Sequence, residues 1–170
     1  FAATTPEGSS PGIEATREAV EGATGIPIQF FVIIDMQGFS DLVDALGGIT
    51  IDIPEDVPIA IGGGPVESWI SAGEDVTLNG YEALWYARSR AGSNDYARME
   101  RQRVVQEAVI AQFTPQTLLT QYAGLSAAGQ DLVQTDIPQS MIGSLTDLAE
   151  RTRQLPITNL ELVPPEVVTY

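Results

Sequence analysis

The chain has 170 residues, of which 44% are hydrophobic and 18% charged, a composition typical of one globular domain. It contains 8 Lys+Arg, all of them arginine, against 23 Asp+Glu, so its net charge is −15. The absence of Lys, His and Cys excludes a catalytic triad with histidine, a cysteine nucleophile, a Schiff-base lysine and a zinc site of the usual kind. Such an acidic chain also repels nucleic acid, so we expect no nucleic-acid partner.

The first third of the chain alternates between helical and strand patterns. Residues 1–12 are rich in Gly, Pro, Ser and Thr and predict a loop. Four elements follow: a helix over 13–23, a buried strand over 28–35, an amphipathic helix over 38–48 that stops at Gly47, and a strand over 49–54. This order predicts a layered α/β architecture.

Residues 54–76 predict irregular structure. The glycines of "GGGP" at 62–65 suit a hairpin tip better than a phosphate loop, because the strand–loop–helix context is missing. Further along the chain we expect these elements: a short helix capped by Asn79, a long helix over 97–113, a helix starting at Pro115, an amphipathic helix over 138–155 and a last strand over 159–164.

Five of the eight arginines lie within sixteen positions: Arg88, Arg90, Arg98, Arg101 and Arg103. On extended backbone, Arg88 and Arg90 would point to the same side. Because 98, 101 and 102 are spaced i, i+3, i+4, a helix would place these residues on one face. The helix N-terminus would add backbone N–H donors. The cluster therefore predicts a pocket for one small anion such as a diphosphate.

Three further assignments belong to this stretch. Asp95 stands where a helix N-cap is expected, so its role is structural or supporting. Arg103 lies off the common face and should pair with an acid in solvent. The alternative for the whole cluster is a set of structural ion pairs, although surface pairs contribute only about 0–1 kcal/mol each.

Two other groups of residues have open interpretations. The aromatic residues Trp69, Trp85, Phe30 and Phe31 could line a lipid pocket or belong to the core. The acidic stretch "DIPED" at 52–56 could hold a hard cation or be a solvated strand end.

Three motifs, in order over about 70 residues, resemble the LytR-CpsA-Psr (LCP) family. They are "IDMQGFSDLVDALGGITIDIP" at 34–54, "LNGYEALWYARSR" at 78–90, and "ALWYARSRAGSNDYARMERQRVV", which contains Arg-x-Arg, Asp-aromatic-x-Arg and Arg-Gln. The looser resemblance runs from about residue 13 to residue 164. It implies an α/β fold with a central, mostly mixed sheet, helices on both faces in three layers, and a hydrophobic pocket for a lipid tail.

The resemblance also implies an activity. Family members move a glycopolymer from a polyprenyl-diphosphate carrier to a muramic acid hydroxyl of peptidoglycan, with help from Mg²⁺. By motif position, the diphosphate would be bound by catalytic Arg88, Arg90, Arg98 and Arg101, together with Gln102; Asp95 matches the family's aspartate. The resemblance leaves teichoic acid, capsule and arabinogalactan open as the polymer. The Lys-free, Ala- and Gly-rich composition favours an actinobacterium, and with it arabinogalactan.

The resemblance covers only part of the family's domain. We therefore expect residues 13–170 to be the C-terminal portion of one LCP-like domain. The metal ligands and the membrane anchor would belong to an upstream portion, which would pack against this one. The expected location is the outer face of the cytoplasmic membrane of a Gram-positive or actinobacterial species. Two alternatives remain open: a pyrophosphatase that uses water as acceptor, and a non-catalytic module that binds lipid phosphate or wall polymer.

Overall fold

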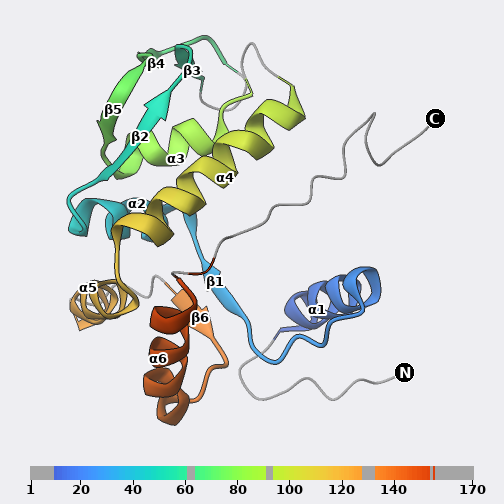
Figure 1. The fold of residues 1–170 in the computed structure, drawn as a ribbon. Coiled ribbons are helices and arrows are strands. Elements are labelled where there is room, and N and C mark those ends of the chain that lie inside the picture. Colours follow the sequence, from blue (N-terminus) through green and yellow to red (C-terminus); the bar gives the residue numbers. More distant parts are fainter. Residues whose placement is uncertain (1–9, 61–63, 91–93, 128–132, 154, 156–170) are drawn as a thin grey trace.

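The structure is a computed structural model that describes residues 10–60, 64–90, 94–127, 133–153 and 155 (Figure 1). The elements follow in this order: α1 (Pro11–Thr24), β1 (Val32–Ile34), α2 (Met36–Ala45), β2 (Ile49–Ile53), β3 (Val57–Ile59), β4 (Ser68–Ile70), β5 (Gly73–Leu78), α3 (Gly80–Arg88), α4 (Asp95–Gln112), α5 (Pro115–Ala127), β6 (Val133–Thr135), the 3₁₀ helix η2 (Gln139–Met141) and α6 (Ile142–Thr152). The predicted α/β class is confirmed.

The described strands pair differently from the expected central mixed sheet. They form three two-stranded antiparallel sheets, β1–β6, β2–β5 and β3–β4. β3 and β4 pair with Val57 opposite Ile70, so the connection between them is a hairpin, as predicted, although residues 61–63 at its tip lie outside the described residues. The region 54–76 was predicted to be irregular, which is wrong in part: ten of its 20 described residues lie in strands β3, β4 and β5. The many Gly and Pro residues of this region indicated loops, whereas its short strands are stabilised by pairing with other strands.

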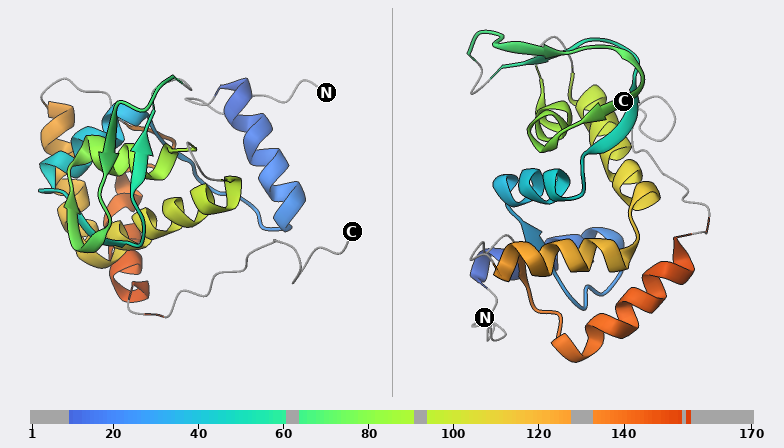
Figure 2. Two further views of the ribbon diagram at one scale, coloured as in Figure 1. Left: turned by 90° about the horizontal axis from the view of Figure 1, so that it is seen from above. Right: turned by 90° about the vertical axis from the view of Figure 1, so that its left-hand side faces the viewer.

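The core lies between the β2–β5 and β3–β4 strands and the helices α3 and α4, which run across them (Figures 1 and 2). β2 alternates strictly: Ile49, Ile51 and Ile53 are buried, while the residues between them face outward. Tyr86 of α3 and Val105 of α4 meet these strands from the helical side. Burial of apolar surface at about 25 cal/mol per Å² is the main stabilising term for such a layer.

The start of α3 is fixed by a cap and by a close helix contact. Asn79 and Glu82 form a complete capping box, as the sequence predicted for Asn79. Gly80 N–H donates to Asp44 Oδ1 of α2 at 2.7 Å, and a Cβ on Gly80 would lie only 2.0 Å from the Ser40 carbonyl oxygen. A glycine is therefore needed for α2 and α3 to approach so closely, and this contact sets one wall of the site described below.

A second region joins α1 to the β1–β6 pair (Figure 1). Arg17 of α1 binds Asp136 at 2.6 Å and lies over the Phe31 ring, while Phe31 N–H donates to the other Asp136 oxygen at 2.8 Å. Burial opposes ionisation of Asp136, but the hydrogen bonds from Phe31 and Arg17 outweigh it and lower its pKa. The strand predicted over 28–35 is present, but only over Val32–Ile34, and the prediction that it is buried is wrong, because all three β1 residues are exposed.

Several boundaries differ from the sequence expectations. The N-cap of α4 is Asn94, not Asp95, which is the first residue of the helix. The helix expected over 138–155 begins as 3₁₀ structure and is α-helical only over Ile142–Thr152. β6 was not predicted, and the strand expected over 159–164 lies outside the described residues. Within the described ranges, no helix is both long and apolar enough to cross a membrane.

Candidate functional site

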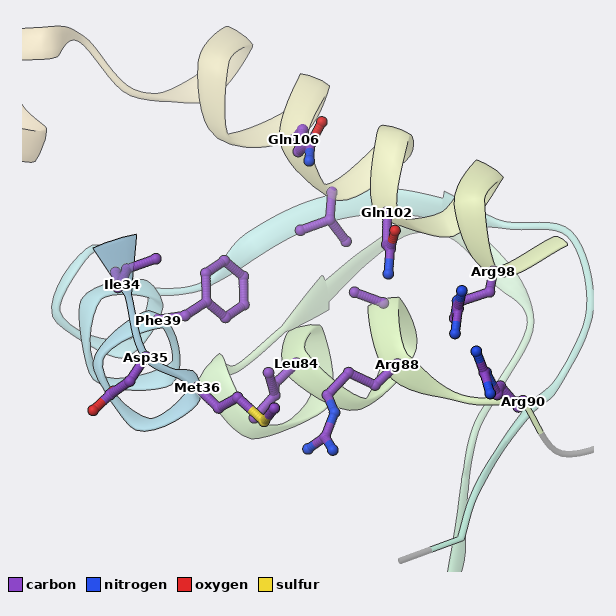
Figure 3. Close-up of a pocket in the computed structure, with 12 residues that line it drawn as sticks. Ile34, Asp35, Met36, Phe39, Leu84, Arg88, Arg90, Arg98, Gln102 and Gln106 are labelled. Atoms are coloured by element: carbon purple, nitrogen blue, oxygen red, sulfur yellow. The ribbon is translucent and has the colours of Figure 1, made fainter. Parts of the chain in front are cut away.

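A cavity of about 640 Å³ opens where α2, α3 and α4 meet (Figure 3). One end is lined by charged and amide side chains from the end of α3 and the first half of α4. The other end is lined mainly by apolar side chains from β1, α2 and the inner faces of α3 and α4, with Asp35 and Gln106 beside them. Its lining residues are Ile34, Asp35, Met36, Phe39, Leu84, Ala87, Arg88, Arg90, Arg98, Gln102, Val105 and Gln106.

The polar end gathers four of the predicted site residues. Arg88, Arg90, Arg98 and Gln102 all line the cavity, although residues 91–93 between the two helices lie outside the described residues. In Figure 3 the guanidinium groups of Arg90 and Arg98 face one another, and Gln102 points into the same space from α4. Arg88 extends away from them and lies over the Trp85 ring, with 5.0 Å from its guanidinium carbon to the ring centroid.

The charges at this end are only partly compensated. Asp95 pairs with both Arg90 (3.3 Å) and Arg98 (3.5 Å), so one carboxylate serves two guanidinium groups. The Arg98 side chain is 25% exposed, and its Nε atom is buried without a hydrogen-bond partner. A buried donor left unpaired costs about 1–3 kcal/mol. An anion in the cavity would add negative charge beside both guanidinium groups and relieve the repulsion between the two arginines.

Arg101 does not join this group. It is 7% exposed and lies on the other side of α4, where its Nε donates to Tyr86 O at 3.0 Å and its Nη2 donates to Ser89 O. Burial lowers the pKa of its guanidinium. The expectation that it shares one face with Arg98 and Gln102 is wrong, because Arg101 and Gln102 are adjacent and diverge by about 100° around a helix of 3.6 residues per turn.

Arg103 behaves as the sequence predicted. It forms ion pairs with Glu100 and Glu107 on the outer face of α4, and the hydrogen bonds that its guanidinium donates to these carboxylates raise its pKa. Pairs of this kind at i, i+3 and i, i+4 are ordinary surface pairs of a helix. Arg103 therefore belongs to the solvated face and not to the cavity.

The apolar end was not predicted residue by residue. Ile34, Met36, Phe39, Leu84 and Val105 line it. They come from β1, α2, α3 and α4, and each belongs to an apolar pattern that also marks a core face, so the pattern alone could not separate a cavity wall from the core. Asp35 also lines the cavity and was not singled out; its Oδ1 caps α2 by accepting from Gly38 N–H at 2.6 Å.

The four aromatic residues considered for a lipid pocket lie elsewhere. Phe30 and Phe31 line a separate cavity beside α1, and Trp85 packs partly buried against the core. Trp69 on β4 is 59% exposed, so it lies in neither the core nor the cavity. None of the four lines the cavity next to the arginines.

The described residues do not fit a divalent metal ion. Across these ranges no group of three or more Asp, Glu, His or Cys side chains is placed to hold one. In the stretch 52–56, Asp52 and Asp56 instead accept backbone N–H groups of Asp75 and Ala72, which ties neighbouring strands together.

Comparisons with known proteins show which family the chain resembles. A teichoic acid transferase of Halalkalibacterium halodurans, named polyisoprenyl-teichoic acid–peptidoglycan teichoic acid transferase TagU, is 36% identical over 128 residues, which are 74% of this chain and 40% of the relative. The chain thus spans less than half the length of this curated relative. The crystal structure of B. subtilis TagV superposes with a TM-score of 0.62 at 29% identity, covering 81% of this chain and 52% of that one.

A third match broadens the range of species. A LytR-Csp2A-Psr enzyme from Actinomyces oris superposes with a TM-score of 0.60 at 26% identity, over 76% of this chain and 53% of that one. The LytR_cpsA_psr family model matches residues 3–165. The arginine motifs, the fold and these matches lead to one conclusion: the chain belongs to the LytR_cpsA_psr family.

Proposed function

We propose that this chain carries the lipid-diphosphate site of a phosphotransferase that moves a glycopolymer from a polyprenyl-diphosphate carrier to peptidoglycan. The observation that carries the proposal is the two-part cavity, with Arg90, Arg98 and Gln102 at one end and an apolar wall at the other. This division matches an amphiphile with an anionic head and a hydrocarbon tail. The relative from H. halodurans is named for transfer of this kind.

The arginines suit the anionic head for a physical reason. A guanidinium keeps its charge at any physiological pH and presents a planar fork that binds phosphate oxygens in pairs. The guanidinium groups of Arg90 and Arg98 face each other at one end of the cavity, so an anion beside them would be bound by both. Gln102 adds a neutral amide donor from the next turn of α4.

The chemistry is displacement at phosphorus. The acceptor sugar hydroxyl attacks the phosphorus atom that carries the glycopolymer, and the bond to the bridging oxygen of the diphosphate breaks. Prenyl phosphate leaves with that oxygen, a phosphodiester forms, and the hydroxyl proton is released. The arginines would stabilise the charge that accumulates on the phosphate oxygens, which is a positioning and electrostatic contribution.

The finer parts of the assignment are also proposals. The prenyl chain would lie along Phe39, Leu84 and Val105. The reaction would occur at the outer face of the cytoplasmic membrane. The ligands of Mg²⁺ and the membrane anchor would belong to parts of the protein other than the described residues. Arabinogalactan as cargo rests on composition only and stays a prediction.

One reaction assay separates the three candidate functions. The full-length protein is incubated with a prenyl-diphosphate-linked saccharide, Mg²⁺ and a soluble peptidoglycan fragment, and both prenyl phosphate and the saccharide–peptidoglycan product are measured. Prenyl phosphate released together with the ligated product supports the transferase. Release that needs no fragment and gives no ligated product identifies a pyrophosphatase, and binding without release identifies a carrier-binding module; either result contradicts the proposal.

A further inference from the structure

The C-terminal end of α3 is held in place by a side chain from α4. Arg101 donates through Nε to Tyr86 O at 3.0 Å and through Nη2 to Ser89 O, three residues further along. We propose that Arg101 is a positioning residue for the diphosphate site, acting through this backbone segment and not through contact with the substrate. This inference rests on the proposed function for its catalytic meaning.

The arrangement has a clear physical basis. The last carbonyl groups of a helix have no partner within the helix, and Tyr86 O is one of them. A cation at a helix C-terminus also interacts favourably with the helix dipole. The Arg101 side chain and its two acceptors are buried: Arg101 is 7%, Ser89 4% and Tyr86 2% exposed. Hydrogen bonds between such buried groups are costly to break.

A second contact fixes the same point from the strand side. The Ser89 hydroxyl donates to Pro58 O of β3 at 2.6 Å. Ser89 is thus bound by α4 through its carbonyl and by β3 through its hydroxyl. Arg88 and Arg90 are its immediate neighbours, and both line the cavity. The buried hydrogen bonds of Ser89 therefore fix the backbone from which the two exposed arginine side chains project. A flexible loop would not hold this backbone in one position.

Arg101 is also placed unfavourably for direct binding. It lines a different, smaller cavity on another side of α4, beside Glu55 and Glu100, and it does not line the cavity of Arg90 and Arg98. A diphosphate next to those two glutamates would be repelled. The family motif places Arg101 among the arginines of the site, and the structure separates its role from theirs.

The first test uses the fluorescence of Trp85 to detect whether Arg88 keeps its position, and it needs no ligand. Arg88 lies over the Trp85 ring, and the chain has only two tryptophans, so Trp69→Phe leaves Trp85 as the sole tryptophan probe within this chain. The variants are prepared in the full-length protein, with any tryptophan outside this chain also replaced by phenylalanine. In that background Arg88→Ala gives the emission spectrum of an uncovered Trp85. We expect Arg101→Lys to shift the Trp85 spectrum toward that of Arg88→Ala, because lysine keeps the charge but lacks the planar two-pronged donor. A spectrum identical to that of the Trp69→Phe parent overturns the proposal.

The second test measures binding of farnesyl diphosphate, with circular dichroism confirming that each variant is folded at the assay temperature. We expect Arg101→Lys to raise the dissociation constant about tenfold, which corresponds to ~1.4 kcal/mol. Ser89→Ala keeps Arg101 and loses only the hydroxyl contact, so it should shift both readouts in the same direction by a smaller amount. Arg103→Lys, on the solvated face of the same helix, should change neither.

The outcomes separate this inference from the proposed function. If the unchanged protein does not bind farnesyl diphosphate, the proposed function fails, whereas the Trp85 spectra still decide whether Arg101 holds the end of α3. If Arg101→Lys weakens binding but leaves the Trp85 spectrum unchanged, Arg101 acts on the ligand directly and the positioning role is wrong. If a folded Arg101→Lys binds as tightly as the unchanged protein, the positioning role is wrong as well.

Discussion

Replacing Arg98 by alanine should weaken binding of a prenyl diphosphate by one to two orders of magnitude. Arg98 lines the polar end of the cavity, and its guanidinium faces that of Arg90. A hydrogen bond to a charged group contributes about 1.5–3 kcal/mol, which is a factor of roughly 10 to 150 in affinity. The loss has a second component, because Asp95 would then neutralise Arg90 alone instead of being shared.

The assay is calorimetric titration of the protein with farnesyl diphosphate at fixed ionic strength. Arg103→Ala is the matched control, since it removes the same unit of charge from the same helix but from the solvated face. Arg103→Ala should stay within about twofold of the unchanged protein, because exposed charges are screened over about 8–10 Å in physiological salt. Equal weakening by both substitutions would mean that net charge, and not a site at Arg98, governs binding.

Three further predictions concern the scaffold and the apolar wall. Gly80→Ala should lower the free energy of unfolding by about 1–3 kcal/mol or more, because the new Cβ would lie 2.0 Å from a backbone oxygen of α2. The control is Gly143→Ala on α6, where no atom lies within 4 Å of the new Cβ, so it should be neutral or stabilising in the same thermal melt. Phe39→Ala should reduce the preference for farnesyl over geranyl diphosphate and leave the affinity for pyrophosphate unchanged; equal losses for all three ligands would contradict an apolar tail site. Asp136 has a lowered pKa in the folded state, so its stabilising contribution is present above the pKa of an unfolded aspartate, about 3.9, and is lost as the pH falls through the folded value. An acid titration of unfolding should therefore be less steep for Asp136→Asn, and identical curves would contradict this role.

The elements best predicted from the sequence were those with strong local signals. Asn79 is followed three residues later by Glu82, and the structure has the complete capping box at the start of α3. The alternation of Ile49, Ile51 and Ile53 with polar residues predicts a strand, and in the structure these three residues form the buried face of β2. In each case the information lies within a few neighbouring residues, so no knowledge of the tertiary structure was needed.

The failures have a common origin in tertiary contacts. β1 has an apolar, β-branched sequence like that of a buried strand, yet its burial depends on what packs against it, and its described residues are exposed. The short strands β3 and β4 are stabilised by each other, across residues rich in Gly and Pro. Arg101 carries the same motif signal as Arg98, and only the position of the Tyr86 and Ser89 carbonyls separates their roles. The spacing of the motif residues predicted that most of them lie in one site, but it could not predict the direction in which each side chain points.

The central claim is that one cavity binds both a diphosphate and its attached hydrocarbon chain. The most direct test is titration of the full-length protein, in parallel, with farnesyl diphosphate, inorganic pyrophosphate and farnesol, and with Mg²⁺ held constant. The account predicts that farnesyl diphosphate binds at least tenfold more tightly than either half of the molecule, because the polar and apolar ends of the cavity act together. Equal affinities for farnesyl diphosphate and pyrophosphate, or no binding of farnesyl diphosphate, would contradict it.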